Sequence, residues 1–345
     1  MWIASDAEAA EGQSTAPAEV AEESLFSVDT GIGPLVYRPG RGLQVGRTGL
    51  NIGGFATLEL QKERGDDWQL SVDGINFLVL LQPIQPLRLF MELEVGNLFQ
   101  VDLNDGEHES DPTANFQRLY AEYGLSDALN LRFGKFQTPV GEWNLVPAEP
   151  FTWTTTEPLE LEAFDEHQTG PMLYGSFFPG DGTLSYWLYG QIQDFDSESD
   201  EDPADHSAGA RLEYSSAGDA WSVGSSFLAA TRDDRWGYVG GLDAVWRRGP
   251  FELSSEFLHT WGPLDNPVRW DVFVQGVVEV FPSWFLVGRY EHNAPSGGGA
   301  DLDLGDVGVV WKPRPYVIFK ATYRFADHRS EDVFEGFKSS LAVIF

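Results

Sequence analysis

The chain divides into many short segments in which apolar and polar residues alternate, and this alternation constrains the fold more than any other feature. In residues 87–97, for example, apolar side chains occupy one face of a strand while Arg88, Glu92 and Glu94 occupy the other. Charges on the inner face of a soluble sandwich would be costly to bury unless each one were paired. A water-filled lumen solvates them, so the pattern favours a β-barrel with lipid outside.

Sixteen such segments can be recognised, each ended by turn residues. They cover residues 50–60, 68–80, 87–98, 115–123, 129–137, 170–177, 183–190, 207–214, 220–230, 236–246, 251–259, 270–280, 284–290, 305–311, 317–325 and 337–345. Connections after even-numbered segments are short, and those after odd-numbered segments are mostly long, as in outer-membrane barrels. We therefore predict an all-β fold, a sixteen-stranded antiparallel transmembrane β-barrel.

The connection after the fifth segment, residues 137–168, is too long for an ordinary turn and contains four Pro residues but no Lys or Arg. Long loops without secondary structure are usually functional or disordered, and the aromatic residues argue against disorder. We predict an inward-folded constriction loop whose pore-lining residues are Glu142, Trp143, Glu149, Trp153, Glu157, Glu160, Glu162, Asp165 and Glu166. The two Trp residues would stack on solutes or, in the preferred interpretation, pack the loop onto the wall.

Alternation also directs a set of basic side chains toward the lumen, and we expect them to line the wall opposite the loop. These are Arg88, Arg118, Arg132, Arg211, Arg289, Lys320 and Arg324. Loop acids facing wall bases would create a transverse electric field across the passage. The alternative for each base is a salt bridge to an inward acid on a neighbouring strand, such as Glu92, Glu122 or Glu213, and for any single residue this alternative is preferred.

The residues from Phe133 to Gly141, FGKFQTPVG, contain the pattern Gly-x-Phe-x-x-Pro-x-Gly at a strand end. This pattern resembles the phosphate-selective porin O and P family and, more loosely, trimeric porins in general. The resemblance implies a constricting loop after the fifth strand and a homotrimer. Those porins direct anions with Lys and Arg, whereas this loop has seven acids and no base, so phosphate selectivity is not expected here.

The chain ends on Leu341, Val343 and Phe345 in alternation. This resembles the last strand of bacterial outer-membrane proteins, whose terminal aromatic residue is recognised by the barrel-assembly machinery. Outer-membrane lipid and lipopolysaccharide are further expected partners.

Composition sets the remaining limits. Residues 1–48 form an acidic, Ala- and Gly-rich tail and linker, expected to be disordered at its start, and residues 49–345 form the barrel. Met1 to Ser5 are too short for the apolar region of a signal peptide, so a removed leader or a misplaced start is expected.

A formal net charge of −32 excludes nucleic acid as a partner, because phosphate binding needs a basic surface. No run of eighteen apolar residues is present.

These features predict an outer-membrane porin, a passive diffusion channel for small hydrophilic solutes or ions with a preference for cations. The alternatives are a barrel that sheathes a periplasmic or outer-membrane partner, such as an electron-transfer protein, and a secreted acidic soluble β protein. No enzyme activity, cofactor or metal is expected, since no two of the six His residues have metal-ligand spacing and no Gly-x-Ser-x-Gly motif occurs.

Overall fold

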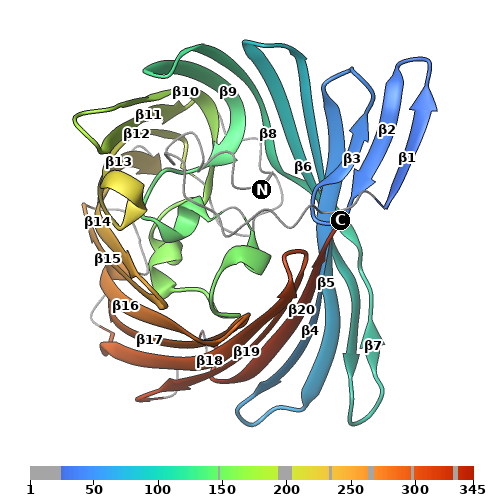
Figure 1. The fold of residues 1–345 in the computed structure, drawn as a ribbon. Coiled ribbons are helices and arrows are strands. Elements are labelled where there is room, and N and C mark those ends of the chain that lie inside the picture. The colour runs from blue at the N-terminus through green and yellow to red at the C-terminus, as the bar shows by residue number, and fades with distance from the viewer. Residues whose placement is uncertain are drawn as a thin grey trace.

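Sixteen antiparallel strands close into a barrel in the computed structural model of this protein (Figure 1), which describes residues 25–146, 148–192, 204–232, 235–262, 268–296, 299–328 and 333–345. The barrel strands are β4 (Leu50–Glu63), β5 (Trp68–Ile84), β6 (Leu87–Asp102), β8 (Thr113–Ser126), β9 (Leu129–Gln137), β10 (His167–Phe177), β11 (Thr183–Gln191), β12 (His206–Ser215), β13 (Trp221–Arg232), β14 (Arg235–Arg248), β15 (Phe251–Trp261), β16 (Val268–Phe281), β17 (Trp284–Pro295), β18 (Leu302–Arg314), β19 (Val317–Ala326) and β20 (Gly336–Ile344). Each strand pairs with the next, and β20 closes the barrel by pairing with β4. The predicted fold class is thereby confirmed.

All sixteen predicted segments correspond to these strands, although most observed strands extend further at one or both ends. Short turns connect the strands at one end of the barrel, for example at residues 85–86 and 315–316. Longer connections lie at the other end, for example at residues 103–112. We call these the short-turn end and the long-loop end.

The outer surface of the barrel is apolar, as the alternation predicts. Leu188, Leu212 and Leu242 are between 51% and 59% exposed although they lie in the middle of strands. The inner face of the same strands holds buried polar groups, such as Arg211 and Asp243. A soluble protein has the reverse arrangement, so the exposed apolar strands indicate a surface that meets lipid.

The connection between β9 and β10, residues 138–166, runs through the interior of the barrel (Figure 1). It contains three short 3-10 helices, η2 (Trp143–Leu145), η3 (Glu149–Phe151) and η4 (Leu159–Ala163). A fourth, η5 (Ala217–Asp219), lies in a short turn. None of the helices in the described parts of the chain is long and apolar enough to cross a membrane.

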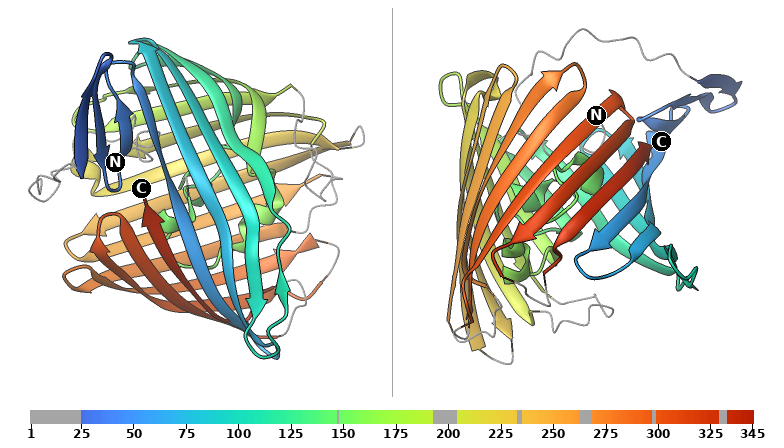
Figure 2. Two further views of the ribbon diagram at one scale, coloured as in Figure 1. Left: turned by 90° about the vertical axis from the view of Figure 1, so that its right-hand side faces the viewer. Right: turned by 90° about the horizontal axis from the view of Figure 1, so that it is seen from below.

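Part of the predicted linker is folded. Residues 26–45 form three short strands, β1 (Phe26–Thr30), β2 (Gly33–Arg38) and β3 (Gly42–Val45), and β3 pairs with the start of β4. These strands project from the barrel wall (Figures 1 and 2). The linker prediction failed here because Gly and Pro mark turns, and short strands fit between closely spaced turns. The acidic tail before residue 25 lies outside the described residues. A two-residue strand, β7 (His108–Glu109), extends the hairpin of β6.

Candidate functional site: an acid-lined passage through the barrel

The inner loop begins and ends at neighbouring points of the wall, where one backbone hydrogen bond and two side-chain hydrogen bonds close its base. The Thr138 N–H donates a 2.7 Å hydrogen bond to the Glu166 carbonyl. The Asn144 side-chain amide donates to the carbonyls of Thr138 and Glu166, at 2.8 and 3.2 Å. The loop therefore leaves β9 and returns to β10 as one closed structure.

Two glycines of the FGKFQTPVG segment permit this path. Gly134 has φ +137° and a Cβ there would overlap the Leu119 carbonyl on β8. Gly141 has φ +68° and a Cβ there would overlap the Glu256 carboxylate on β15. Both backbone conformations disfavour residues that carry a side chain. The two Gly positions of the motif are thus explained by close approach of the backbone to the wall.

The far side of the loop is attached to the wall formed by β15 to β20. The Trp143 N–H donates to Glu256 Oε1 at 2.6 Å, and the Leu159 N–H donates to Glu291 Oε1 at 2.5 Å. Arg289 donates to the Thr156 carbonyl at 2.9 Å. These bonds satisfy backbone groups that would otherwise be unpaired inside the barrel.

Two further bases, on β19, bind the loop. Arg324 donates to the Glu157 carbonyl at 2.8 Å. Lys320 forms a 2.6 Å ion pair with Glu149, and its ammonium also donates to the Thr152 hydroxyl at 2.9 Å. The loop thus spans the lumen from the β9–β10 side to the β19 side.

The seven wall bases predicted to face the passage all have acidic partners. Six of them pair with acids on barrel strands: Arg118 with Glu92 (2.6 Å), Arg132 and Arg88 with Glu122 (2.9 and 3.4 Å), Arg211 with Asp243 (2.5 Å), and Arg289 and Arg324 with Asp306 (2.7 and 2.9 Å). Lys320 instead pairs with the loop. Salt bridges between strands, the alternative given for each base, therefore involve six of these side chains, whereas Lys320 faces the loop acid Glu149 and Arg211 also lies 3.6 Å from the loop acid Glu142.

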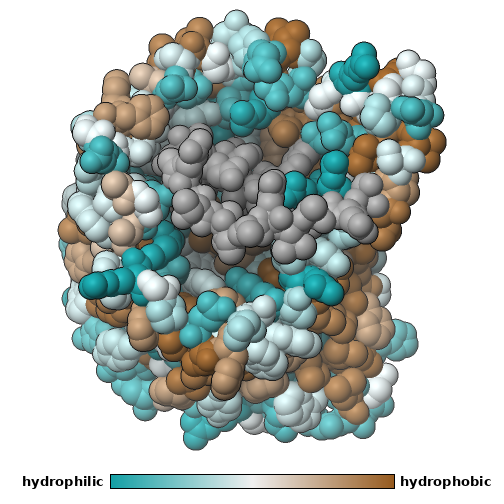
Figure 3. Space-filling view, in the orientation of Figure 1, coloured by the Kyte–Doolittle hydropathy of each residue, from teal (hydrophilic) through white to brown (hydrophobic). Residues whose placement is uncertain are grey.

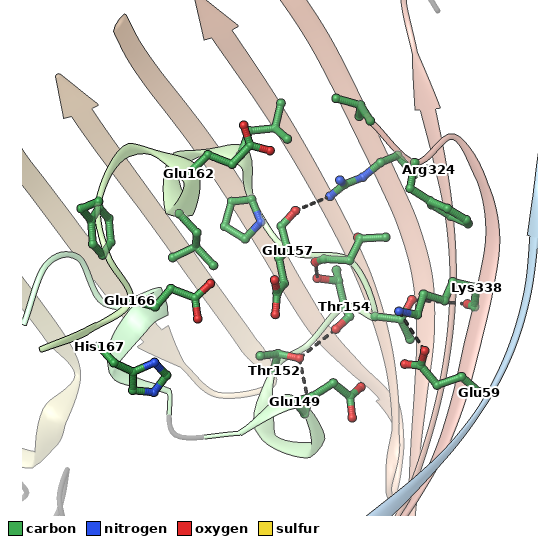
Figure 4. A pocket seen from close by; sticks show the side chains of 18 of the residues that line it. Glu59, Glu149, Thr152, Thr154, Glu157, Glu162, Glu166, His167, Arg324 and Lys338 are labelled. Carbon is green, nitrogen blue, oxygen red and sulfur yellow. Dashed lines mark hydrogen bonds and ion pairs between the residues drawn. The ribbon is translucent and has the colours of Figure 1, made fainter. Parts of the chain in front are cut away.

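The loop leaves open a cavity of about 820 Å³, which the loop and wall residues from β4, β6, β8, β11, β19 and β20 line (Figure 4). Seven acids line it: Glu59 and Glu94 from the wall and Glu149, Glu157, Glu162, Asp165 and Glu166 from the loop. The bases that line it are Arg324 and Lys338. A second cavity of about 220 Å³ shares Glu59, Glu94, Glu149, Glu157 and Glu166 with the first, so the two cavities adjoin, and we call them together the acidic passage.

Several of these acids form ion pairs, among them Glu149 with Lys320 at 2.6 Å. Lys338 pairs with Glu59 at 3.0 Å, and Arg232 pairs with Asp165 at 2.7 Å. Arg324, which lines the cavity, is also shared with Asp306. Glu157 and Glu162 are exposed in the cavity and come from the loop (Figure 4). Acids therefore line the cavity both from the loop and from the wall.

Two of the predicted loop acids do not line this passage. Glu160 is buried against the wall, and burial together with the neighbouring Glu256 raises its pKa well above the ordinary value. Glu142 is partly buried, and burial with the neighbouring Glu213 raises its pKa to about 8. Both groups favour the protonated form near neutral pH, which reduces the cost of placing acids under the loop.

The two Trp residues pack the loop, in agreement with the preferred interpretation. Trp143 is buried, and its ring meets Phe273 edge to face with centroids 6.0 Å apart. The Trp153 indole N–H donates to Glu252 at 2.7 Å, and the Lys312 ammonium lies 4.1 Å from the centroid of its ring system. Of the two, only Trp143 borders a described cavity, the smaller one.

Glu59, Lys338 and His167 also line the passage, although they are not among the site residues that the sequence predicts. Glu59 and Lys338 lie on the strands that close the barrel, where alternation does direct them inward. His167 is the first residue of β10. Glu59 and Lys338 could both have been identified as charged residues at inward-facing positions of β4 and β20, the two strands that close the barrel.

One acidic cluster has the spacing of a metal site. The carboxylate oxygens of Glu142, Glu213 and Asp243 lie within 4.8 Å of one another. The Arg211 guanidinium lies among them, 2.8 Å from Glu213 and 3.6 Å from Glu142. The Arg211 guanidinium therefore supplies the positive charge that balances these three carboxylates, and the cluster needs no metal ion to explain it.

Comparison with known proteins supports the fold and does not assign a family. No family model matches the chain, and no curated protein sequence matches it. Solved structures do match. OmpT of Vibrio cholerae with loop L8 deleted has 12% identity and a TM-score of 0.60, over 86% of this chain and 99% of that one. OmpF of Salmonella typhi, solved with daunomycin, has 12% identity and a TM-score of 0.60, over 86% of this chain and 97% of that one.

The anion-selective porin of Comamonas acidovorans has 12% identity and a TM-score of 0.57, over 86% of this chain and 98% of that one. At this identity the similarity concerns the fold alone. The sixteen-stranded barrel is thus one that outer-membrane porins also have.

Proposed function

We propose that this protein is an outer-membrane porin, a passive diffusion channel that prefers cations over anions. The observation that carries the proposal is the passage lined by seven acids and two bases, bounded by the inner loop and by wall residues of β4, β6, β8, β11, β19 and β20. Porins with the same fold include an anion-selective one. Selectivity must therefore arise from the lining residues and cannot be taken from the fold.

The electrostatic argument depends on where the acids lie. Glu157, Glu162 and Glu166 come from the loop, and Glu59 and Glu94 come from the facing wall. A narrow passage with protein walls is screened less than an open surface, so these charges concentrate cations and repel anions. Most wall bases are held in ion pairs outside the passage and oppose this effect only weakly. Small hydrophilic cations are the expected permeant solutes.

The outer membrane is the proposed location. The apolar exterior requires a lipid environment, and the barrel leaves no unpaired strand edge within its wall. The chain ends beside the closing seam, where the Phe345 N–H donates to the Gly54 carbonyl at 2.8 Å. A terminal aromatic residue at this position fits recognition by the barrel-assembly machinery. Contact with lipopolysaccharide and a homotrimeric assembly complete the proposal.

Planar bilayers test the channel directly. Purified protein added to a bilayer in KCl should give steady, discrete conductance steps. The rival proposal, a barrel that sheathes a periplasmic electron-transfer protein, predicts no steady open level when the partner is bound. Absence of conductance from folded protein without any partner would contradict the channel proposal.

A further inference from the structure

An apolar patch lies on the lumen face of β13 and β14, where this fold otherwise places polar groups. Hydrophobic residues belong to the outer wall, as on the side of the molecule that carries β4 and β5 (Figure 3). Leu228 instead shares its face of β13 with Ser226, which accepts a hydrogen bond from the Gly141 N–H in the inner loop. Leu228 pairs with Val239 in the strand register, and the two residues are 2% and 6% exposed. They border a third cavity, of about 250 Å³.

Small side chains explain why this cavity exists. Ser207, Ala230 and Gly237 are neighbours in one cross-strand row of β12, β13 and β14, and all three line the cavity. Ala163 and Phe164, which are 3% and 7% exposed, line it from the inner loop. Because the three small residues do not fill the space beneath the loop, a hollow remains between the loop and the wall.

The third cavity and the acidic passage lie against different parts of the wall. Among the described residues, only Phe164 and Asp165 of the inner loop line both. Arg232 is the last residue of β13, Gly262 follows β15 and Ser296 follows β17, so the third cavity lies at the long-loop end. Outer-membrane barrels turn this end to the outside of the cell. Solutes outside the cell are therefore the candidate ligands of this cavity.

Three polar side chains at the cavity hold atoms that lack a hydrogen-bond partner in the described part of the chain. These atoms are Gln168 Oε1, Ser207 Oγ and Arg232 Nε. Gln168 and Ser207 are only 2% and 6% exposed, and the Nη2 atom of Arg232 is paired with Asp165 at 2.7 Å. Buried polar atoms without partners are unfavourable. A ligand that offers a donor to Gln168 and an acceptor to Arg232 would relieve this cost.

The charges at this cavity favour an anionic group on the ligand. Both carboxylate oxygens of Asp165 are occupied, Oδ1 by Arg232 and Oδ2 by the Ala204 N–H at 3.0 Å. Arg269 also lines the cavity, is exposed, and makes no ion pair with any described residue. A guanidinium group binds a carboxylate through charge-assisted hydrogen bonds. Arg269 is therefore available for a carboxylate that enters the cavity.

We propose that the third cavity binds small carboxylic acids that carry an apolar side chain and a neighbouring N–H or O–H donor, which is the chemistry of apolar amino acids such as leucine. The apolar side chain packs against Leu228 and Val239, the donor pairs with Gln168, and the carboxylate binds Arg232 and Arg269. An apolar cavity of roughly 150 Å³ already holds benzene, so about 250 Å³ accommodates such a molecule. The proposal is independent of ion selectivity, because the acidic passage has its own lining.

Isothermal titration calorimetry of the folded protein in detergent tests this proposal with three related probes. L-leucine has all three features, 4-methylpentanoate lacks the donor, and L-leucinamide lacks the carboxylate. Leucine should bind saturably, and each of the other two should bind roughly tenfold more weakly, because each leaves one polar group of the cavity without its partner. No saturable binding of leucine, or equal affinity for all three probes, would overturn the proposal.

Variants locate the binding in this cavity and separate it from channel function. Ala230→Phe places a ring in the hollow and should abolish leucine binding, whereas Ala229→Phe, on the opposite face of the same strand, should not. Both variants should keep the heat-dependent gel mobility of a folded barrel. Arg269→Gln, at an exposed position where folding is not at stake, should weaken leucine roughly tenfold and leave leucinamide unchanged. Wild-type leucine affinity in folded Ala230→Phe or in Arg269→Gln would contradict the site, and absent conductance with leucine binding intact would count only against the channel proposal.

Discussion

Lys320 on β19 forms a 2.6 Å ion pair with Glu149 in the inner loop, and its side chain is fully buried. A base that alternation directs into the lumen therefore holds the loop in place. Arg289 and Arg324 act in the same way through carbonyls of the loop. The position of the loop, and with it the width of the passage, depends on these three side chains.

The first prediction concerns this attachment. Lys320→Met should loosen the loop and lower the free energy of unfolding by about 3 kcal/mol, because it removes one partner of a buried ion pair. Single-channel recordings should show larger and noisier conductance than the wild type. The control is Arg64→Met, which breaks an exposed pair with Glu335 away from the inner loop and should change neither quantity much. Quiet, wild-type recordings from folded Lys320→Met would refute the role of this pair.

The second prediction concerns the acids of the passage. Replacing Glu157, Glu162 and Glu166 by Gln should lower the ratio of cation to anion permeability by roughly tenfold, because local ion concentration follows the field of these charges. The ratio is obtained from reversal potentials. Glu160→Gln should leave it nearly unchanged, since that carboxyl is buried against the wall and away from the cavity. Removing three exposed acids at the short turns, as Asp127→Asn, Asp181→Asn and Glu279→Gln, controls for total charge. Equal losses from both triple variants would mean that the loop acids do not line the passage.

The third prediction concerns pH. Burial raises the pKa of Glu142 from 4.5 to about 8 in the folded protein. The protonated Glu142 carboxyl is compatible with the docked loop, and its contribution to docking is complete below pH 4.5. This contribution is lost as the pH rises through 8 and the carboxyl ionises in its buried position. Susceptibility of the loop to added protease should therefore increase between pH 6 and pH 9, on the order of several-fold. Glu142→Gln should flatten this dependence, whereas a wild-type loop that becomes more resistant as the pH rises would contradict it.

The fourth prediction concerns the glycines of the FGKFQTPVG segment. Gly134→Ala should destabilise the barrel by about 1–3 kcal/mol, because the new Cβ meets a strand carbonyl in a conformation that Ala disfavours. Gly141→Ala should cost less, since it meets the end of the Glu256 side chain, which can move. Urea unfolding followed by tryptophan fluorescence measures both. Gly218→Ala, in a short turn with open space around it, separates the conformational cost from the overlap. If Gly134→Ala were no more harmful than Gly218→Ala, close approach to β8 would not be the reason for this glycine.

Sequence alone predicts the barrel because successive side chains of each strand point alternately to lipid and to the watery lumen, and the residue types alternate accordingly. The sixteen segments were recognisable since charges such as Glu92 and Glu94 alternate with apolar residues within one strand. The loop after the fifth segment was recognisable by its length and Pro content. The strands β1 to β3 were not recognisable, because they are short and closely spaced Gly residues at positive φ, such as Gly33 and Gly42, separate them.

The lining of the passage was harder to predict, for two physical reasons. Whether Arg118 meets an acid depends on strand register, which places Glu92 directly opposite it. Which loop acids face water depends on how the loop folds, and an irregular backbone has no period from which the direction of a side chain can be read. Glu160 and Glu162 are two residues apart, yet one is buried against the wall and the other is exposed in the cavity.

The reversal potential of the wild-type protein in a planar bilayer under a tenfold KCl gradient tests the central claim most directly. An acid-lined open passage predicts a steady conductance whose reversal potential has the sign and most of the size of the Nernst potential for K⁺. A reversal potential near zero or toward that of Cl⁻, or a folded barrel that conducts nothing, would contradict it.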